Sequence, residues 1–600
     1  MGFNLPKRQA GRVLLAFISV FGWRAAVADV TPFSEQDTVA ICPTVRFDKN
    51  IKFALKDMEK RLICGDQELD SIGQAWAVVP PAQAKYFLRG FLQARGFHQP
   101  VFFQDGDVLY VQFGPKTELR NFRVSGQPAE WNPPQRRFIF GEALTPTLLD
   151  ELQSWTLSEL KNIGYPCATA TTRADPVSGE VLVSLAPDLP KIVKAFTDSG
   201  VSGLGPGVLD RYNAFRIGDL YREDLVTLTR RRTQADGIVQ TYAMNPRCAP
   251  DGVTILRDVI LGPSRTVRLG AGGTTDRGAI VKGSVRANRI GPSASAAQAA
   301  VSLSYLYSNV NQQTADINYR YYDSASSARS YFETSAKFDH DAEAVLENQS
   351  FESKLLYGSS KEFAAGQFEL RAGPTFLDSH LYRGQGPSDV TVTFLQTDLR
   401  WTSHFFEFFA TSPREGENLL ASILIAQKDA GSEFTAQKIQ VQGEKIWNLL
   451  PFDPPLLLLA GRFNFASVFS PEEAIRAELP PRFLTFLGGD QDLRGFDPAS
   501  LPRSGEGALS AATASLEVRL HNVVFRRADV FSFLDSGLLG AVAFVLHRPI
   551  LMSPGLGVRY ESPIGVFRVY VAQRFALDEE VGNLPYGQAY RFGLTFGQEF

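Results

Sequence analysis

The chain has 600 residues, of which 44% are hydrophobic and 21% charged, a balance that excludes a disordered or low-complexity protein. Lys and Arg number 61 against 64 Asp and Glu, so the net charge of −3 lacks the basic surplus of a general nucleic-acid binder. After Trp23 no uninterrupted apolar run approaches the ~18 residues of a membrane helix, which excludes a polytopic helical membrane protein. A membrane protein made of strands stays compatible, because alternating strands average to neutral hydropathy.

The N-terminus has the pattern of a secretory signal peptide. Lys7, Arg8 and Arg12 precede an apolar stretch over residues 13–23, and Ala26-Val27-Ala28 then offers a small-x-small cleavage site. We expect residues 1–28 to be removed; a buried N-terminal helix is the alternative. The four cysteines would then lie in an oxidising compartment, where disulfides or buried thiols are favoured over redox chemistry and three pairings are open. They are Cys42, Cys64, Cys167 and Cys248.

A pattern of one helix followed by two strands occurs three times in the first half. The three helices are expected to end at Gly96, Gly164 and Gly237, about 70 residues apart, which indicates a repeated α+β module. The predicted helices span residues 86–95, 145–163 and 223–234; the strand pairs are 101–103 with 108–113, 167–171 with 181–185, and 238–242 with 253–260. Strands over residues 118–124 and 191–196 are expected to open the second and third modules. The run Arg230-Arg231-Arg232 predicts a solvated helix face, with acidic headgroups as the alternative contact.

From about Arg265 the sequence alternates with a period of two. Leu516, Val518 and Leu520 alternate with polar residues, and charged residues recur between large apolar ones through the rest of the chain. At about 21 residues per strand and connection, this length predicts a transmembrane antiparallel β-barrel of roughly 16 strands. The sheet has to close, because lipid tolerates no open edge.

The last strand carries the clearest signal of this kind. One face holds Tyr590, Phe592, Leu594, Phe596 and Phe600, and the other holds Arg591, Gly593, Thr595, Gly597 and Glu599. An aromatic alternating strand with a terminal Phe resembles the recognition signal of outer-membrane barrels. The alternative is the last strand of an ordinary soluble domain.

Four motifs in the second half together resemble the BamA/TamA superfamily of outer-membrane assembly and secretion barrels. The first resembles that family's GG-x-x-x-(V/I/L)-R-G-(F/Y) loop and reads Gly488-Gly489-Asp490-Gln491-Asp492-Leu493-Arg494-Gly495-Phe496. Glu517 stands in a Ser-Leu-Glu strand, and residues 533–537 resemble the F-x-D-x-G strand. Residues 557–565 resemble the penultimate-strand signature. The resemblance implies that the ~70-residue modules are POTRA domains.

The resemblance also implies the domain boundaries. These are a signal peptide (1–28), POTRA 1 (29–117), POTRA 2 (118–190), POTRA 3 (191–264) and a barrel (265–600). Three modules resemble the TamA branch, and so do residues 96–100 and the glycine-rich segment 270–278 around Asp276. Ile280 and Gly237-Ile238 depart from the family pattern.

In this family the loop that carries Arg494, Gly495 and Phe496 folds into the barrel lumen. A buried Arg is costly unless paired, and strand alternation turns Glu517 and Asp535 inward, so we expect these carboxylates to hold Arg494. The alternative is that the carboxylates of Glu517 and Asp535 are simply hydrated in the lumen and do not bind Arg494. The resemblance further implies a weak seam between the first and last barrel strands. Gly593 and Gly597 are expected to weaken it because they pack nothing.

The resemblance implies a factor in the outer membrane of a Gram-negative bacterium, with its modules in the periplasm. It would insert or secrete client proteins such as autotransporters through the opening seam. We expect it to work with a TamB-like partner that is anchored in the inner membrane. The resemblance also implies a role in lipid transport between the membranes. A two-partner secretion pore for one exoprotein and a passive porin are the alternatives. The sequence has no HExxH, G-x-S-x-G, P-loop or G-x-G-x-x-G, so we expect no enzyme, cofactor or metal.

Overall fold

The computed structural model describes residues 37–49, 53–65, 79–306, 309–323, 329–343, 345–409, 413–471, 477–563, 565–577 and 589–597. The expected signal peptide and Phe600 lie outside these residues. The chain divides into two compact units. The first comprises Met1–Arg120, Ala143–Leu148 and Asp175–Gly179, and the second comprises Asn121–Glu142, Leu149–Ala174 and Glu180–Phe600.

The described residues of the first unit form a four-stranded sheet with two helices. Its strand order is β1-β2-β4-β3, with β2 parallel to β4. The elements are β1 (Thr38–Cys42), β2 (Val45–Asp48), α1 (Asp57–Cys64), α2 (Pro81–Gln93), β3 (Val101–Asp105) and β4 (Val108–Gln112). Helix α2 starts with a proline at its first turn and buries Ala84, Leu88 and Leu92, which recur every four residues on one face. A disulfide joins Cys42 and Cys64.

Two three-stranded sheets precede the barrel in the second unit. One has the order β5-β8-β7 beside α3, and the other has the order β10-β11-β9 beside α4. Their elements are β5 (Asn121–Ser125), β6 (Gln135–Arg136), α3 (Pro146–Asn162), β7 (Thr169–Ala174), β8 (Glu180–Ala186), β9 (Val193–Ser199), the 3-10 turn η3 (Leu209–Tyr212), α4 (Glu223–Ala235), β10 (Val239–Ala249) and β11 (Gly252–Leu261). The disulfide Cys167–Cys248 joins the two sheets.

The helices and strands predicted in the first half form, with ends shifted by a few residues. Gly96, Gly164 and Gly237 follow their helices with φ of +91°, +108° and +71°, the left-handed conformation that glycine adopts at helix ends. None of the helices in the described part of the chain is long and apolar enough to cross a membrane.

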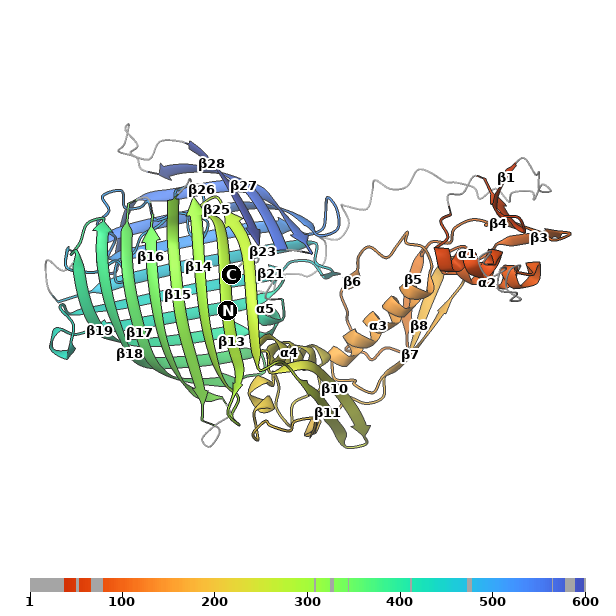
Figure 1. Cartoon of the computed structure of the whole chain (residues 1–600), viewed down its shortest axis with the longest axis horizontal. Helices are drawn as coiled ribbons and strands as arrows, with labels where there is room; N and C mark the ends of the chain where they lie inside the picture. Colours follow the sequence, from red (N-terminus) through yellow and green to blue (C-terminus); the bar gives the residue numbers. More distant parts are fainter. Residues whose placement is uncertain are drawn as a thin grey trace, which may run out of the picture. The chain divides into compact units, whose positions relative to one another are not determined.

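In the part of the chain that the structure describes, sixteen antiparallel strands form one closed barrel, which confirms the predicted strand count. Figure 1 shows β13 to β19 side by side in chain order. The strands are β12 (Arg265–Thr274), β13 (Gly278–Ile290), β14 (Ser295–Leu306), β15 (Asn309–Tyr322), β16 (Ser330–Ala342), β17 (Glu347–Glu362), β18 (Gly366–Arg383), β19 (Asp389–Ser403), β20 (Gly416–Ala426), β21 (Ala436–Asn448), β23 (Leu457–Phe469), β24 (Ser510–Leu520), β25 (Ala528–Val542), β26 (Val545–Ser562), β27 (Gly565–Leu577) and β28 (Ala589–Gly597). Short elements in the connections are α5 (His404–Phe408), η4 (Lys428–Ala430) and β22 (Phe452–Asp453). The predicted penultimate-strand signature lies mainly in β26, the third strand from the end.

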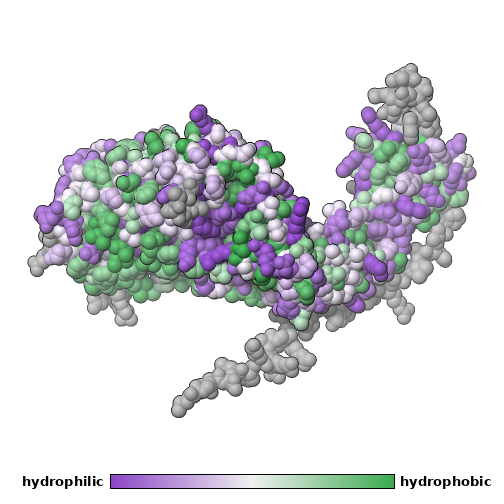
Figure 2. All heavy atoms as spheres, turned by 90° about the horizontal axis from the view of Figure 1, so that it is seen from below, coloured by the Kyte–Doolittle hydropathy of each residue, from purple (hydrophilic) through white to green (hydrophobic). Residues whose placement is uncertain are grey.

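The barrel exterior is apolar, and its interior holds polar side chains together with apolar groups that pack against the connection between β23 and β24. On β24, Leu516, Val518 and Leu520 are exposed while Glu517 between them is buried, as the alternation predicts. Figure 2 shows hydrophobic residues gathered over the barrel wall. An outward apolar band of this kind is typical of a barrel that faces lipid.

The arginine run of α4 forms the predicted solvated face only in part, because Arg231 is exposed while Arg232 is not. Arg232 is buried and donates to Glu362 at 3.0 Å and to Glu407 at 2.5 Å, and the Arg231 guanidinium stacks on Phe408 at 4.0 Å. The two carboxylates come from the end of β17 and from α5, at the rim of the barrel where β12 begins, here called the proximal rim. Barrel turns far ahead in the chain supply these partners, so the local sequence could not reveal them.

Candidate functional site

The junction between the first and last barrel strands, here called the seam, is short. In the described part of β28, only Gly273 with Phe596 and Thr274 with Thr595 are in register. The backbone N–H of Thr275 adds one hydrogen bond to the Leu594 carbonyl at 2.9 Å. By contrast, β12 pairs with β13 at ten positions and β27 pairs with β28 at nine. The seam therefore has the fewest paired positions of the strand junctions described in the barrel.

The connection between β23 and β24, of which residues 477–509 are described, lies inside the barrel and is here called the lumen loop. Leu479, Phe483 and Leu484 pack with inward residues of β18 to β21 and β23. Further along the loop, Leu493 and Phe496 pack with Leu551 and Ala576 of the wall. These two apolar clusters fix the loop within the lumen.

Arg494 of the lumen loop is 2% exposed, and all three nitrogens of its guanidinium donate hydrogen bonds. Its Nε and Nη2 donate to the two Asp535 carboxylate oxygens at 2.9 and 2.7 Å, and its Nη1 donates to Glu517 at 2.6 Å. Its guanidinium also lies 3.4 Å from the centre of the Phe533 ring. The planar fork thus bridges β24 and β25 through two carboxylates, a geometry that a lysine could not reproduce.

Glu517 belongs to a wider group of charges, here called the lumen ion cluster: Arg494, Glu517, Arg519, Asp535 and Arg568. Arg519 and Arg568 donate to Glu517 at 2.6 and 2.8 Å. The structure therefore brings together Arg494, Glu517 and Asp535 of the predicted site residues, in paired form.

Gly495 and Phe496, the other two predicted loop residues, have packing roles beside the lumen ion cluster. A Cβ on Gly495 would lie 2.5 Å from Ser553 Oγ, so the loop approaches β26 more closely than any side chain allows. Phe496 is buried in the second apolar cluster. The loop is thus held by shape as well as by charge.

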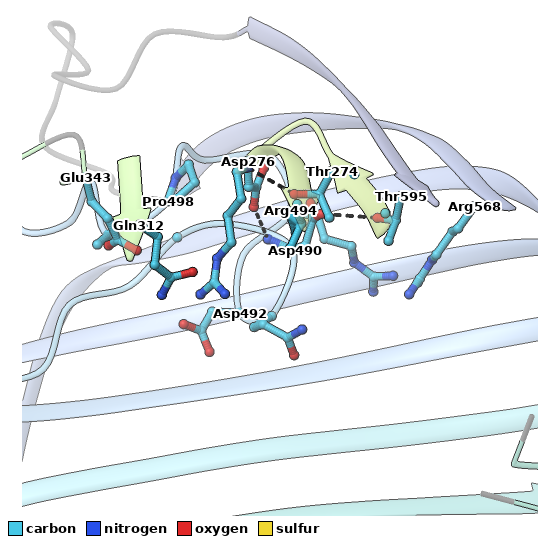
Figure 3. A pocket seen from close by; sticks show the side chains of 18 of the residues that line it. Thr274, Asp276, Gln312, Glu343, Asp490, Asp492, Arg494, Pro498, Arg568 and Thr595 are labelled. Carbon is cyan, nitrogen blue, oxygen red and sulfur yellow. Dashed lines mark hydrogen bonds between the residues drawn. The ribbon is translucent and has the colours of Figure 1, made fainter. Parts of the chain in front are cut away.

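A second polar group, which the sequence did not single out, lies at the seam itself. This seam cluster consists of Asp276, Asp490 and Arg591. Asp276 in the turn after β12 forms an ion pair with Arg591 of β28 and accepts a hydrogen bond from the Asp490 N–H of the lumen loop at 2.9 Å. Figure 3 shows Asp276, Asp490 and Thr595 drawn together there.

Arg591 also ties the last strand to the lumen loop. Its Nη1 donates to the backbone carbonyls of Arg494 and Phe496 at 3.0 and 2.9 Å. The sequence signal for Arg591 was its place on the polar face of the last strand. The signal for Asp276 was the Thr-Asp pair in segment 270–278. Neither signal says that the two residues meet.

The outward face of β28 carries the predicted aromatic residues. Tyr590, Phe592 and Leu594 are exposed on the barrel exterior, and Phe596 stacks on Phe567 with ring centres 4.3 Å apart.

Gly593 corrects one expectation, because it does pack a neighbour. The ring of Tyr570 fills the space where a Cβ on Gly593 would be, and the Tyr570 hydroxyl bonds Asp490 of the lumen loop. Gly593 is therefore explained by close packing against β27, and its effect on the seam is indirect. The packing around Gly597 lies outside what the structure describes.

A cavity of about 950 Å³ lies in the lumen beside the loop. Its lining includes Lys282, Lys337, Asp339, Glu444 and Arg519, from several parts of the wall. Such a lining favours water and ions over an apolar ligand. Among the described residues, no three His, Cys, Asp or Glu side chains are placed to hold a metal ion.

No protein-family model matches the chain. Among solved structures, it is similar to BamA from Haemophilus ducreyi lacking POTRA domains 1–3, with 14% identity over 77% of this chain and 95% of that one and a TM-score of 0.48. CdiB from Escherichia coli is similar at 12% identity over 86% of this chain and 97% of its own, with a TM-score of 0.46. CdiB from Acinetobacter baumannii has 12% identity over 91% and 100% of the two chains and a TM-score of 0.44.

Proposed function

We propose that this chain is a TamA-like factor of the BamA/TamA superfamily, which inserts or translocates client proteins at the outer membrane of a Gram-negative bacterium. The observation that carries the proposal is the seam, where β12 and β28 share two register pairs, whereas β12 pairs with β13 at ten positions and β28 pairs with β27 at nine. An edge with so few backbone hydrogen bonds is a template for a client strand. The apolar exterior of the barrel supports its placement in the membrane. In this proposal the small sheets that precede the barrel lie in the periplasm.

The lumen loop supports this function over that of a passive porin. Its apolar clusters and the lumen ion cluster occupy the lumen, which a diffusion pore would keep open. In this proposal the loop holds β24 and β25 in register through Arg494 while the seam opens. Binding and membrane energetics drive the work, with no catalytic residue, cofactor or metal.

The first unit supports a role in partner binding. Its strand β3 is an edge of the described sheet and exposes Val101 and Phe103, and Tyr86 of α2 is 77% exposed. An apolar edge suits addition of a strand from a long periplasmic protein of the TamB kind. Purification of the full chain from its native membrane tests this part. A TamB-like partner supports the assembly role, whereas a single secreted exoprotein supports the two-partner secretion alternative.

A photo-crosslinking side chain on β12 tests the seam directly. Leu269 lies outside the two seam pairs and is 85% exposed, so a probe there is expected to capture a client in transit. Leu556 on β26 is also exposed on the barrel exterior, but its strand is paired on both sides, and it provides the matched control. Capture from Leu556 and Leu269 alike would contradict entry through the seam.

A further inference from the structure

A short segment of the second unit adds a strand to the proximal rim of the barrel. Strand β6 lies parallel to β22, which belongs to the turn between β21 and β23. The Gln135 N–H donates to the Pro451 carbonyl at 2.6 Å, and the Arg137 N–H donates to the Asp453 carbonyl at 2.8 Å. Only these two residues of each strand pair, so the backbone contact is small.

The side chain of Arg136 reinforces this contact. Its Nη1 donates to Asp453 Oδ2 at 2.6 Å, and Trp155 Nε1 donates to the same oxygen at 2.9 Å. Its Nη2 donates to Glu151 of α3 at 2.5 Å. One rim carboxylate therefore accepts hydrogen bonds from both the guanidinium of β6 and the indole of α3.

Arg137 enters a site made by the barrel alone. Its Nη1 donates to the carbonyl oxygens of Pro455 at 2.5 Å, His521 at 3.1 Å and Pro454 at 3.4 Å. These carbonyls come from two different rim turns, the one after β21 and the one after β24. Oriented carbonyl dipoles from two turns form an acceptor for a cation, and none of them belongs to the segment that donates it.

The rim thus presents an edge for an extended backbone, a carboxylate for one basic side chain and a carbonyl group for the next. We infer that this rim site binds extended peptides with two adjacent basic residues, and that residues 135–137 occupy it as an intramolecular stand-in for a client segment. The inference rests on the proposed function, because it assumes that extended client chains arrive at this rim. A tethered occupant competes at high effective concentration, so it keeps weak ligands out, while its small contact leaves it displaceable.

Competition with a peptide probe tests the rim site in the full chain. The probe is a fluorescent peptide with the sequence of residues 132–139, Asn-Pro-Pro-Gln-Arg-Arg-Phe-Ile, measured by anisotropy in detergent micelles. The variant Arg136→Ala/Arg137→Ala is expected to vacate the site and bind the probe at least tenfold more tightly than the wild type. Adding Asp453→Asn is expected to remove most of that gain, and a probe with both arginines replaced by alanine should not bind.

A second variant keeps the test valid if the double substitution misfolds. Gln135→Pro removes the N–H that donates to Pro451 and leaves both arginines in place, so it should also release the segment and expose the site. Equal probe affinity in wild type and both variants would overturn the inference, and so would no binding in any of them. Client capture at Leu269 without probe binding would overturn the rim site and leave the proposed function standing. Probe binding without client capture at Leu269 would overturn the proposed function and leave the rim site standing.

Discussion

Asp276 and Arg591 form an ion pair across the seam, although 315 residues separate them in the sequence. Asp276 also accepts the Asp490 N–H, so the turn after the first strand, the last strand and the lumen loop meet at one carboxylate. Polar contacts on the lumen side therefore supplement a backbone pairing of two positions.

A double-mutant cycle on this pair is expected to show strong coupling. Residues that share a hydrogen-bond network deviate from additivity by about 0.5–3 kcal/mol, and both partners here are mostly buried. Unfolding of Asp276→Ala, Arg591→Ala and the double variant by urea in lipid vesicles gives the coupling free energy. Single effects that add to the double effect would show that the seam cluster does not act as a unit.

Loss of Arg494 is expected to free the lumen loop while the barrel still inserts. Arg494→Ala leaves Asp535 buried without its guanidinium, and breaking a buried pair in this way costs about 3–5 kcal/mol. Arg494→Lys keeps the charge but loses the fork, so its effect should be smaller. Proteinase K cleavage of the loop measures the change, and Arg503→Ala, an exposed arginine of the same loop, is the control. A resistant Arg494→Ala loop would contradict this role.

The packing of Gly495 leads to a rescue experiment. Gly495→Ala places a Cβ 2.5 Å from Ser553 Oγ and is expected to destabilise the loop by about 1–3 kcal/mol, as overpacking does. Ser553→Gly removes that oxygen and should restore part of the loss in the double variant. The remaining contact with Arg574 at 3.2 Å limits the rescue. Heat-modifiable electrophoresis follows the folded barrel, and an absence of any rescue would point to a different cause.

Strand alternation and one motif predicted the Arg494 contacts, because both carboxylates lie on inward positions of neighbouring strands. The seam cluster could not be predicted in this way. Its ion pair depends on the register at which the barrel closes, and two register pairs set that closure. The partners of Arg232, the strand addition by β6 and the close approach of Tyr570 to Gly593 likewise depend on turns and rings brought together only by the folded barrel.

The α3 helix should lose stability as the pH rises toward neutrality. Burial and the nearby carboxylates of Asp453 and Asp224 raise the pKa of Glu159 from 4.5 to about 7 in the folded chain, and Arg136 opposes the shift. Since the folded-state pKa is the higher one, the stabilising contribution is complete below pH 4.5 and is lost as the pH rises through 7.

Hydrogen exchange of the α3 amides between pH 5 and 8 measures this loss, after correction for the intrinsic exchange rate. Glu159→Gln should flatten the pH profile of exchange, because the glutamine side chain carries no charge at any of these pH values. Asp150→Asn, an exposed position on the same helix, should keep the wild-type profile. A pH-dependent profile in Glu159→Gln equal to that of the wild type would assign the effect to another group.

Covalent closure of the seam tests the central claim most directly. Thr274 and Thr595 lie opposite each other in the register, so Thr274→Cys/Thr595→Cys can be joined by a disulfide, and a cysteine pair at Val571 and Phe592 across β27 and β28 is the matched control. The measurement is client insertion into vesicles that contain the oxidised protein. We expect the seam disulfide to abolish insertion and the control disulfide to leave it unchanged. Full insertion through the oxidised seam would contradict the account.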